Sequence, residues 1–474
     1  MYIEQFYVPK IAHSSYLLGG KENCAIVDPR RDVQIYIKAA QRMGFKITHI
    51  LETHLHADFV SGHLDLAEKT GAKIYVPASG NCQFKHQPLQ EEDEFKIDDL
   101  AIRVIETPGH TPEHLSYVVV DKSRGKEPVA VFCGDTLFVG DVGRPDLFPG
   151  RAKELASQLF ISLKKLKELP DFCEVLPAHG AGSLCGRAIG AKRTSTIGYE
   201  KKYNKALQIE SEEDFIDSLT HKMPPVPDHF SRCSDINRKG PELVRNIKKI
   251  KSSKSLEFGE LAKSGDYVIL DCRSYDAFGG QHIIGSYGID FDGNFPTFSG
   301  WVVPPEKKIL LITPHRLEAE EVAIWLRRVG LDSTVGFLEG GMFEWAKDGL
   351  PTQHICQISA PALEHIRNSE TIHILDVRAL SEFEEQHIEG AINIPAPDLR
   401  KRYRELDKEK KYYVICSTGH RSSLAISILL QKGFYRLINV AGGMTGIGEF
   451  GENREMIKKW GSFPYLGKLH RKQS

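Results

Sequence analysis

The sequence is poor in cysteine, and its cysteines form no pair of the CxxC kind. Its 474 residues include nine cysteines, an odd number scattered between Cys24 and Cys416. This pattern excludes the disulfide framework of a small secreted domain and is typical of reduced thiols in the cytoplasm. The first ten residues, MYIEQFYVPK, also lack the basic start and apolar stretch of a secretory signal. We therefore expect a cytoplasmic protein in which one or two thiols are reactive.

Long apolar runs and an excess of one charge are missing as well. No run approaches the ~18 apolar residues that a membrane-spanning helix requires. The 62 lysines and arginines balance 63 aspartates and glutamates, which gives no electrostatic reason to expect nucleic acid or a membrane as partner. What is present is an ordinary globular composition, with 41% hydrophobic residues, in a chain too long for one core. Two to four domains are therefore expected.

The first 200 residues alternate short apolar runs with loops and stretches of helical spacing, which predicts a mixed α/β domain. Strands are expected at 25–28, 47–51, 74–76, 101–105, 116–120 and 129–132, and a helix at 33–44. Residues 201–255 are rich in proline, serine and charge. They predict an extended connector that packs on this first domain.

The remainder of the chain contains an internal repeat. Three short segments recur at an offset of 105 or 102 residues: LDCR at 270–273 and LDVR at 375–378, HIIG at 282–285 and HIEG at 387–390, and GGM at 340–342 and 442–444. Each unit alternates strands and helices, so we expect two small α/β domains, each with a parallel sheet.

Four predicted strand ends in the first domain carry histidine or aspartate. The segments are THLHAD at 53–58, TPGHT at 107–111, GDTLF at 134–138 and PAHG at 177–180. Imidazole and carboxylate groups bind borderline divalent metals, and loops at strand ends can direct them at one point. A polar surface loop would explain a lone HxHxD segment equally well, but the four segments together indicate a metal site.

The order and spacing of these segments resemble the metallo-β-lactamase superfamily, which implies an αββα sandwich. Hydrolases of that superfamily, such as glyoxalase II, read HxHxDH and hold two metals. This chain has Phe59 at the last position, and a benzyl side chain cannot coordinate a metal. Asp58 and His179 remain, but a single metal with open coordination positions is the expectation.

Resemblance to the persulfide dioxygenase branch of the superfamily implies one Fe(II) per chain. By that resemblance the ligands would be His54, His110 and Asp135. Two histidines and one carboxylate leave coordination positions open for substrate and oxygen. The residues implied to lie beside the site, as supports or as a weak ligand, are His56, Asp58 and His179.

Two further residues near this motif set are candidates. The segment GDVGRPD at 140–146 resembles the GxGRxD stretch of the same dioxygenases. It makes Arg144 a candidate catalytic residue that steadies the metal-site loop through Asp146 or faces an anionic substrate; an ordinary Arg–Asp pair is the alternative. Where those dioxygenases read PAHDY, this chain continues from PAH into GAGSLCG. Cys185 in this stretch is a candidate substrate-binding or redox-active thiol, although a buried inert cysteine is the commoner case.

The segment CSTGHRSS at 416–423 is the second strong signal. An apolar strand runs into this loop, and a helix is expected to begin near Ser422. Loop amides and a helix N-terminus would point positive ends at the Cys416 sulfur and favour the nucleophilic thiolate. Arg421 offers a planar fork for an anion. The C-x4-R spacing is one residue shorter than the C-x5-R of cysteine-based phosphatases, and the smaller cradle suits a persulfide sulfur.

This loop and its flanking segments resemble an active rhodanese, which implies that Cys416 and Arg421 are catalytic. The loop residues implied to bind the substrate are Ser417, Thr418, Gly419 and His420. In the middle repeat the aligned loop has Thr313 in place of the cysteine and Glu318 in place of the arginine. That repeat therefore resembles an inactive rhodanese with a scaffolding or docking role.

The whole arrangement resembles the bacterial multidomain persulfide dioxygenase–sulfurtransferases of the CstB type. The domains implied are a metallo-β-lactamase-fold domain with its connector at 1–245, an inactive rhodanese at 246–352 and an active rhodanese at 353–474. The resemblance implies that O2 oxidises a small thiol persulfide, for example of glutathione, coenzyme A or bacillithiol, to sulfite. Cys416 would then pass a sulfane sulfur to sulfite and form thiosulfate. We also expect a homo-oligomer.

Two other functions stay open. One is a metal-dependent thioester hydrolase of the glyoxalase II type, which would need two metals. The other is a sulfur carrier or sensor whose front domain is vestigial.

Overall fold

A computed structural model describes residues 1–221, 223, 225–313 and 316–452 of the chain. The chain divides into two compact units. The first comprises residues 1–249, 296–305 and 323–333, and the second comprises residues 250–295, 306–322 and those from 334 onward. None of the described helices is both long and apolar enough to cross a lipid bilayer.

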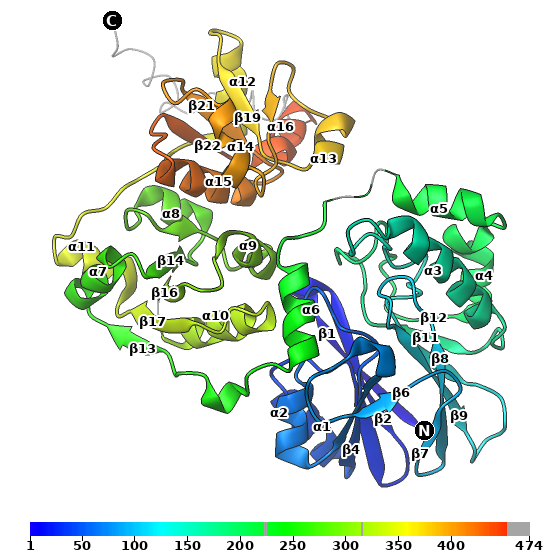
Figure 1. Ribbon diagram of the computed structural model, residues 1–474. Helices are drawn as coiled ribbons and strands as arrows, with labels where there is room; N and C mark the ends of the chain where they lie inside the picture. Colours follow the sequence, from blue (N-terminus) through cyan, green and yellow to red (C-terminus); the bar gives the residue numbers. More distant parts are fainter. Residues whose placement is uncertain (222, 224, 314–315, 453–474) are drawn as a thin grey trace, which may run out of the picture. The chain divides into compact units, whose positions relative to one another are not determined.

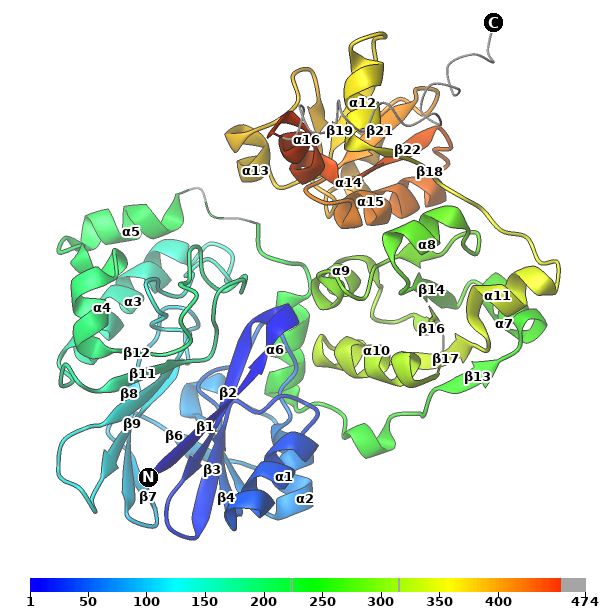
Figure 2. The ribbon, with the colours of Figure 1, turned by 180° about the vertical axis from the view of Figure 1, so that it is seen from behind.

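Two six-stranded sheets form the centre of the first unit (Figures 1 and 2). The first sheet consists, in spatial order, of β1 (Tyr2–Val8), β2 (His13–Gly19), β3 (Asn23–Val27), β4 (Lys46–Leu51), β5 (Lys73–Pro77) and β6 (Gln87–Leu89). The second consists of β12 (Ser195–Thr196), β11 (Glu174–Pro177), β10 (Ala130–Gly134), β9 (Leu115–Asp121), β8 (Leu100–Glu106) and β7 (Glu94–Ile97). All six strands predicted from the sequence of this part are present.

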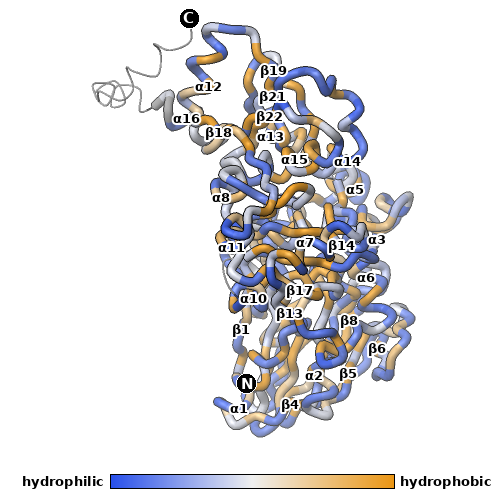
Figure 3. Tube along the Cα trace, turned by 90° about the vertical axis from the view of Figure 1, so that its left-hand side faces the viewer, coloured by the Kyte–Doolittle hydropathy of each residue, from blue (hydrophilic) through white to orange (hydrophobic). Residues whose placement is uncertain are grey.

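Helices cover the outer faces of the two sheets. Helices α1 (Gln34–Met43) and α2 (His63–Thr70) pack on the first sheet through buried residues such as Tyr36 and Leu66. Helix α3 (Ala152–Lys167) packs on the second sheet through residues such as Leu159. Apolar side chains of both sheets fill the space between them, and Figure 3 shows the hydrophobic residues concentrated along the strands. This is the αββα sandwich expected from the motifs.

The expectation of an extended connector after residue 200 is wrong. The segment contains the end of α4 (Ile197–Tyr203) and the helices α5 (Glu212–Thr220) and α6 (Phe230–Lys239). The Ser211 hydroxyl caps α5 by accepting from the backbone N–H of Asp214. Phe215 and Leu219, four residues apart on α5, are fully buried in the core beside α3. The segment does pack on the first domain, as expected, but as amphipathic helices.

Two five-stranded parallel sheets with one topology confirm the internal repeat. The first consists, in spatial order, of β13 (Lys251–Ser253), β17 (Thr334–Leu338), β16 (Lys308–Ile312), β14 (Tyr267–Asp271) and β15 (Tyr287–Gly288). The second consists of β18 (Cys356–Ser359), β22 (Leu437–Ala441), β21 (Tyr412–Ile415), β19 (His373–Asp376) and β20 (Ile392–Asn393). In each sheet the strands of the repeat therefore lie in the order first, fifth, fourth, second, third.

Helices alternate with these strands along the chain. Those of the first repeat are α7 (Ser255–Lys263), α8 (Tyr275–Gly280), α9 (Phe295–Val302), α10 (Arg316–Arg328) and α11 (Gly341–Lys347). Those of the second repeat are α12 (Ala360–Arg367), α13 (Leu380–Glu385), α14 (Leu399–Arg402), α15 (His420–Gln431) and α16 (Gly443–Glu452).

The recurring motif residues build the fold of each repeat. Arg273 pairs with Asp271, as Arg378 pairs with Asp376, and the shortest N–O distance is 2.6 Å in both pairs. Each arginine also donates to a backbone carbonyl eight residues later. Because both repeats share these contacts, the contacts account for the sequence repeat without any sulfur chemistry.

Candidate functional site

The predicted metal-binding residues lie together at the strand ends of the first unit. Residue His54 follows β4, His110 follows β8, and Asp135 follows β10. Oδ2 of Asp135 lies 3.2 Å from Nε2 of His110 and 3.8 Å from Nε2 of His54. All three side chains are buried, and one donor atom of each lies within 4.8 Å of the others. They form a compact set of two nitrogens and one oxygen.

Hydrogen bonds on the far side of each imidazole fix which nitrogen faces the carboxylate. Nδ1 of His110 donates to the carbonyl oxygen of Arg144 at 2.9 Å. The Thr53 hydroxyl donates to Asp28 and can therefore accept from Nδ1 of His54, with both distances 2.9 Å. Each Nε2 thus keeps its lone pair, and neither Nε2 has a hydrogen-bond partner among the described residues. Buried, unpartnered lone pairs beside a carboxylate fit a divalent cation.

The ionisation states agree with this interpretation. Burial lowers the pKa of both His54 and His110, so both rings are neutral. Burial would raise the pKa of Asp135, but the surrounding histidines outweigh it and hold the pKa well below the usual range. The site therefore presents neutral imidazoles and a carboxylate, which are the forms that bind metal.

A further histidine, His179, orients the carboxylate. Its Nδ1 lies 2.8 and 3.0 Å from the two carboxylate oxygens of Asp135, and its Nε2 lies 2.8 Å from Oδ2 of Asp58. Burial lowers the pKa of His179, but the two carboxylates outweigh burial and raise it well above its usual value. A protonated ring has no lone pair for a metal, so this geometry makes His179 and Asp58 supports of Asp135.

His56 faces a different carboxylate pair. Its Nε2 lies 3.1 Å from Oδ1 of Asp28 and 3.8 Å from Oε2 of Glu52. Burial disfavours the charged ring, but these carboxylates more than offset it and raise the pKa of His56. Asp28 also accepts from Thr53, which contacts His54. His56 therefore belongs to the hydrogen-bond network that supports His54.

Phe59 directly follows the THLHAD segment, at the position where the resemblance implies a histidine in two-metal hydrolases. Its ring centroid lies 4.0 Å from that of His13 and 4.4 Å from that of His56, and its side chain is fully buried. A buried apolar wall therefore lies beside His56.

Cys185 lies close to the site. Its sulfur, a carboxylate oxygen of Asp58 and a ring nitrogen of His179 lie within 4.8 Å of one another. Burial, reinforced by Asp58 and Asp135, raises the pKa of the Cys185 thiol well above its usual value. The protonated thiol is therefore the resting form, which is a poor metal ligand and a poor nucleophile.

Arg144 steadies the loop beside the site. Its Nε and Nη2 donate to the two carboxylate oxygens of Asp146 at 2.6 and 2.7 Å, and its Nη1 donates to the Leu184 carbonyl oxygen at 3.2 Å. The side chain is only 1% exposed. Of the two predicted roles, this geometry favours the one in which Arg144 holds the loop whose carbonyl group fixes the tautomer of His110.

Sequence reasoning missed His114 and His13. Nε2 of His114 accepts from the backbone N–H of Asp135 at 2.9 Å, and its ring stacks on His54 at 4.8 Å. His13 lies on β2, and neither of its ring nitrogens has a partner among the described residues. Only the four-residue spacing of His114 from His110 is visible in the sequence, and it matches no ligand motif.

The Cys416 loop lies in the second unit between β21 and α15. The backbone N–H of Gly419 donates to Sγ of Cys416 at 3.1 Å, and Oγ of Ser422 lies 3.5 Å from that sulfur. Gly419 has a φ of +111°, a backbone conformation that favours glycine. Helix α15 begins at His420, slightly earlier than predicted. The loop thus directs a backbone amide at the sulfur of Cys416, a residue that is only 1% exposed.

Arg421 forms an ion pair within this loop. Its Nη1 and Nη2 lie 2.5 and 2.7 Å from the two carboxylate oxygens of Glu382 on α13. Its Nη2 also donates to Oγ of Ser417 at 2.6 Å. The guanidinium group therefore braces the loop through Glu382, and Thr418 lies exposed between these contacts. Glu382 belongs to one of the flanking segments that resemble a rhodanese, but its pairing with Arg421 was not predicted from the sequence.

In the first repeat, Thr313 directly follows β16, as Cys416 follows β21, and is equally buried. Glu318 lies in the first turn of α10. Residues 314 and 315 of the aligned loop lie outside the described residues. The placement of Thr313 agrees with an inactive loop.

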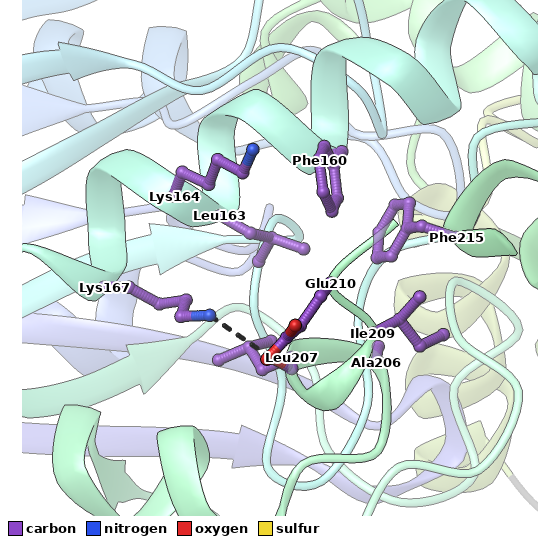
Figure 4. Close-up of a pocket in the computed structure, with 9 residues that line it drawn as sticks. All are labelled: Phe160, Leu163, Lys164, Lys167, Ala206, Leu207, Ile209, Glu210 and Phe215. Atoms are coloured by element: carbon purple, nitrogen blue, oxygen red, sulfur yellow. Dashed lines mark hydrogen bonds between the residues drawn. The ribbon is translucent and has the colours of Figure 1, made fainter. Parts of the chain in front are cut away.

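A separate pocket of about 180 Å³ lies between α3 and α5 (Figure 4). Phe160, Leu163 and Phe215 line it, and Nζ of Lys167 donates to the Leu207 carbonyl oxygen at 3.3 Å. None of its lining residues belongs to the metal-binding set or to the Cys416 loop.

Family models match most of the chain. The metallo-β-lactamase superfamily model matches residues 8–179, and the rhodanese-like domain model matches residues 256–348 and 359–449. Among solved structures, a metallo-β-lactamase from Staphylococcus aureus subsp. aureus COL is 35% identical with a TM-score of 0.65. That match covers 72% of this chain and 99% of the other.

Curated relatives match a smaller part. A hydroxyacylglutathione hydrolase of Rhodospirillum rubrum is 38% identical over 33% of this chain and 57% of its own length. A β-lactamase hydrolase-like protein of Agrobacterium fabrum is 30% identical over 51% of this chain and 61% of its own length. The chain therefore spans less than two thirds of the length of these relatives.

Proposed function

We propose that this chain, which belongs to the metallo-β-lactamase superfamily and carries two rhodanese-like domains, is a persulfide dioxygenase with sulfurtransferase activity. Its substrate would be the persulfide of a small thiol. One ferrous ion per chain would serve the oxidation, and Cys416 would serve the sulfur transfer. The substrate, the metal and the cytoplasmic location are parts of this proposal.

One observation carries the proposal of a single metal. His54 and His110 direct unpartnered Nε2 atoms at one carboxylate, that of Asp135. Phe59 offers no donor atom, and both nitrogens of His179 are engaged by carboxylates. Two neutral histidines and one carboxylate with open positions are typical of mononuclear Fe(II) oxygenases.

The protein residues would prepare the site for oxidation. Bound iron supplies the redox chemistry that lets dioxygen react with the terminal sulfur of the persulfide. The persulfide, dioxygen and water would yield the free thiol, sulfite and two protons. His179 and Asp58 would hold Asp135 in place, while Thr53 and the Arg144 carbonyl group would hold the imidazole rings.

The second step would occur at Cys416. Its thiolate attacks the terminal sulfur of a second persulfide, the S–S bond of that persulfide breaks, and the carrier leaves as a thiolate. The amide of Gly419 donates toward the Cys416 sulfur and would stabilise its negative charge. Sulfite then takes the sulfane sulfur and leaves as thiosulfate. A fused second site raises the local concentration of sulfite.

A thioester hydrolase of the glyoxalase II type is the second candidate, because the curated matches include hydroxyacylglutathione hydrolases. Those matches cover about a third of this chain. The Phe59 wall also disfavours the two-metal site that such a hydrolase would need.

Metal content and oxygen uptake test the proposal. The chain is purified without air, loaded with Fe(II), and supplied in turn with persulfides of glutathione, coenzyme A and bacillithiol. We expect about one iron per chain and oxygen uptake with at least one persulfide. Two zinc ions with thioester cleavage would support the hydrolase instead, and no metal with no uptake would support a sulfur carrier or sensor.

Cys416→Ser separates the two steps. The variant should take up oxygen at the wild-type rate but release sulfite instead of thiosulfate, because serine cannot form a persulfide. Cys356→Ser, which changes an exposed cysteine of the same repeat, should leave both products unchanged. Enzymatic thiosulfate formation by Cys416→Ser would contradict the two-step scheme.

A further inference from the structure

The first rhodanese repeat contributes an ion pair to the loop of the second. Nδ1 of His420 lies 3.1 Å from Oδ2 of Asp290, whose side chain is only 7% exposed. Asp290 is itself held in place, since it accepts from the backbone N–H groups of Tyr275 and Asp292. His420 is the neighbour of Gly419, whose amide donates to the Cys416 sulfur. A carboxylate of the inactive repeat therefore contacts the residue next to the sulfur cradle.

The ring of Tyr275 makes the second contact. It meets His420 edge-on, with ring centroids 5.0 Å apart and an interplanar angle of 79°. It also covers Gly419, because a Cβ atom at that position would lie 3.2 Å from Cζ of Tyr275. Helices α8 and α15, which carry Tyr275 and His420, lie side by side in Figures 1 and 2. The inactive repeat thus fixes both the backbone and the imidazole of the loop.

The rhodanese fold itself does not require these two side chains. At the offset of 105 residues, the second repeat has Leu380 where the first has Tyr275, and Pro395 where the first has Asp290. The first repeat has lost the cysteine from its own loop and has Thr313 there. Its own chemistry therefore does not account for Tyr275 and Asp290, whereas the contact with His420 does.

The exposed part of His420 faces away from this contact. Nδ1 is buried, while the side chain as a whole remains 33% exposed. The Nε2 edge of the ring is therefore the part open to an incoming molecule. The ion pair with Asp290 outweighs burial and raises the pKa of His420, with smaller contributions from Asp292 and Asp276. A positively charged donor beside the Cys416 loop suits an anion.

We propose that Asp290 and Tyr275 of the inactive repeat are positioning residues that hold the His420 imidazolium ready to receive sulfite at the Cys416 persulfide. This inference rests on the sulfur-transfer role proposed above and names the residue that recognises the acceptor. Both terminal nitrogens of Arg421 are already bonded to Glu382 and its side chain is 23% exposed, whereas the His420 side chain is 33% exposed. His420 is therefore the less engaged cation of this loop. The middle repeat would then be retained because it completes its neighbour's site.

The transfer step needs no further reagent. The lone pair of the sulfite sulfur forms a new S–S bond to the terminal sulfur of the Cys416 persulfide. The existing S–S bond breaks, and its electron pair stays on the Cys416 thiolate. The persulfide has by then released its proton to solvent, so thiosulfate leaves with the two negative charges that sulfite brought and Cys416 keeps the one negative charge of the persulfide. A donor on His420 would reduce the repulsion between two approaching anions.

Single-turnover kinetics on the full chain test this role. Cys416 is loaded anaerobically with glutathione persulfide, loading is followed by intact mass, and thiosulfate formation is measured against sulfite concentration. Asp290→Asn and His420→Gln should each raise the sulfite concentration for half-maximal rate about tenfold, as expected for loss of one charge-assisted contact. The rate of persulfide loading should not change, because that step does not use sulfite.

Two controls separate positioning from general structure. Asp266→Asn removes the same charge from an exposed side chain elsewhere in the first repeat and should behave like the wild type. In the double variant, Asp290→Asn should add little to the effect of His420→Gln, because both act through one contact. His420→Gln alone keeps the test valid if Asp290→Asn fails to fold.

If Asp290→Asn and His420→Gln both reached half-maximal rate at the same sulfite concentration as the wild type, the inference would be overturned and the proposed function would stand. A wild-type chain that loads no sulfur on Cys416, or passes none to sulfite, would contradict the proposed function and this inference with it.

Discussion

The Oγ1 atom of Thr53 lies 2.9 Å from Nδ1 of His54. Because the Thr53 hydroxyl group donates its hydrogen to Asp28, it can only accept from His54. This contact selects the tautomer that leaves Nε2 of His54 free to bind a metal. Metal affinity therefore depends on a hydroxyl group that does not touch the metal.

Thr53→Val tests that dependence. Valine has nearly the same shape but no hydroxyl group, so the imidazole loses the contact that orients it. We expect iron affinity to fall about 10- to 100-fold, the usual cost of losing such a support. Competition with a chelator measures the affinity, and Thr53→Ser, which keeps the hydroxyl group, should stay close to the wild type. Equal affinity in Thr53→Val and the wild type would contradict the tautomer argument.

Phe59→His should convert the site to two metals. The ring of Phe59 lies between His13 and His56, and Asp58, His179 and Cys185 already lie within 4.8 Å of one another. An added imidazole would complete a second set of donors, and a cation there would displace the proton of His179. After loading with zinc, the metal content measured by elemental analysis should rise from about one to about two ions per chain. Phe59→Leu is the matched control and should stay at one; the same value for Phe59→His would be against this account.

Local patterns in the sequence predicted the repeat and the strand ends that carry His54, His110 and Asp135, whereas the sandwich and the choice of these three residues as ligands followed from the family resemblance. Each of these residues follows a short apolar strand, and strand ends can be read from neighbouring residues alone. Helices α5 and α6 could not be predicted in this way, because proline and charge in the connector obscured the four-residue spacing of Phe215 and Leu219.

Partners distant in sequence were not predictable either. Glu382 pairs with Arg421 across 39 residues, and Asp290 pairs with His420 from the other repeat. Such contacts depend on which helices and loops become neighbours in space. The sequence pattern identified Arg421 as an anion-binding fork, but it could not indicate that a carboxylate of the chain already occupies this fork.

The Glu382–Arg421 pair predicts how the loop responds to pH. Burial would raise the pKa of Glu382, but Arg421, the Ala379 amide and Ser417 outweigh it and lower the pKa from 4.5 to about 2. As the pH falls, Glu382 is therefore protonated in the unfolded chain before it is protonated in the folded chain. The stabilising contribution is present above about pH 4.5 and is lost as the pH falls toward about 2.

Native-state hydrogen exchange of α15 should show this window. Glu382→Gln should reduce amide protection relative to the wild type at neutral pH, and the difference should shrink below about pH 4.5. Glu384→Gln changes an exposed glutamate on α13, the helix that carries Glu382, and should leave the protection of α15 unchanged. A difference between Glu382→Gln and the wild type that persists undiminished at about pH 3 would exclude this assignment.

Gly443 gives the recurring GGM segment a function in the second repeat. A Cβ atom at this position would lie 2.2 Å from the carbonyl oxygen of Cys416, and its φ is +53°. The neighbouring amide of Met444 donates to that same carbonyl group at 2.8 Å. Gly443→Ala should therefore displace the Cys416 loop and abolish sulfur transfer, while oxygen uptake at the other site continues. Gly448→Ala, in the same helix with open space around it, should keep both activities. Thiosulfate formation by Gly443→Ala at the wild-type rate would show that the loop tolerates the displacement.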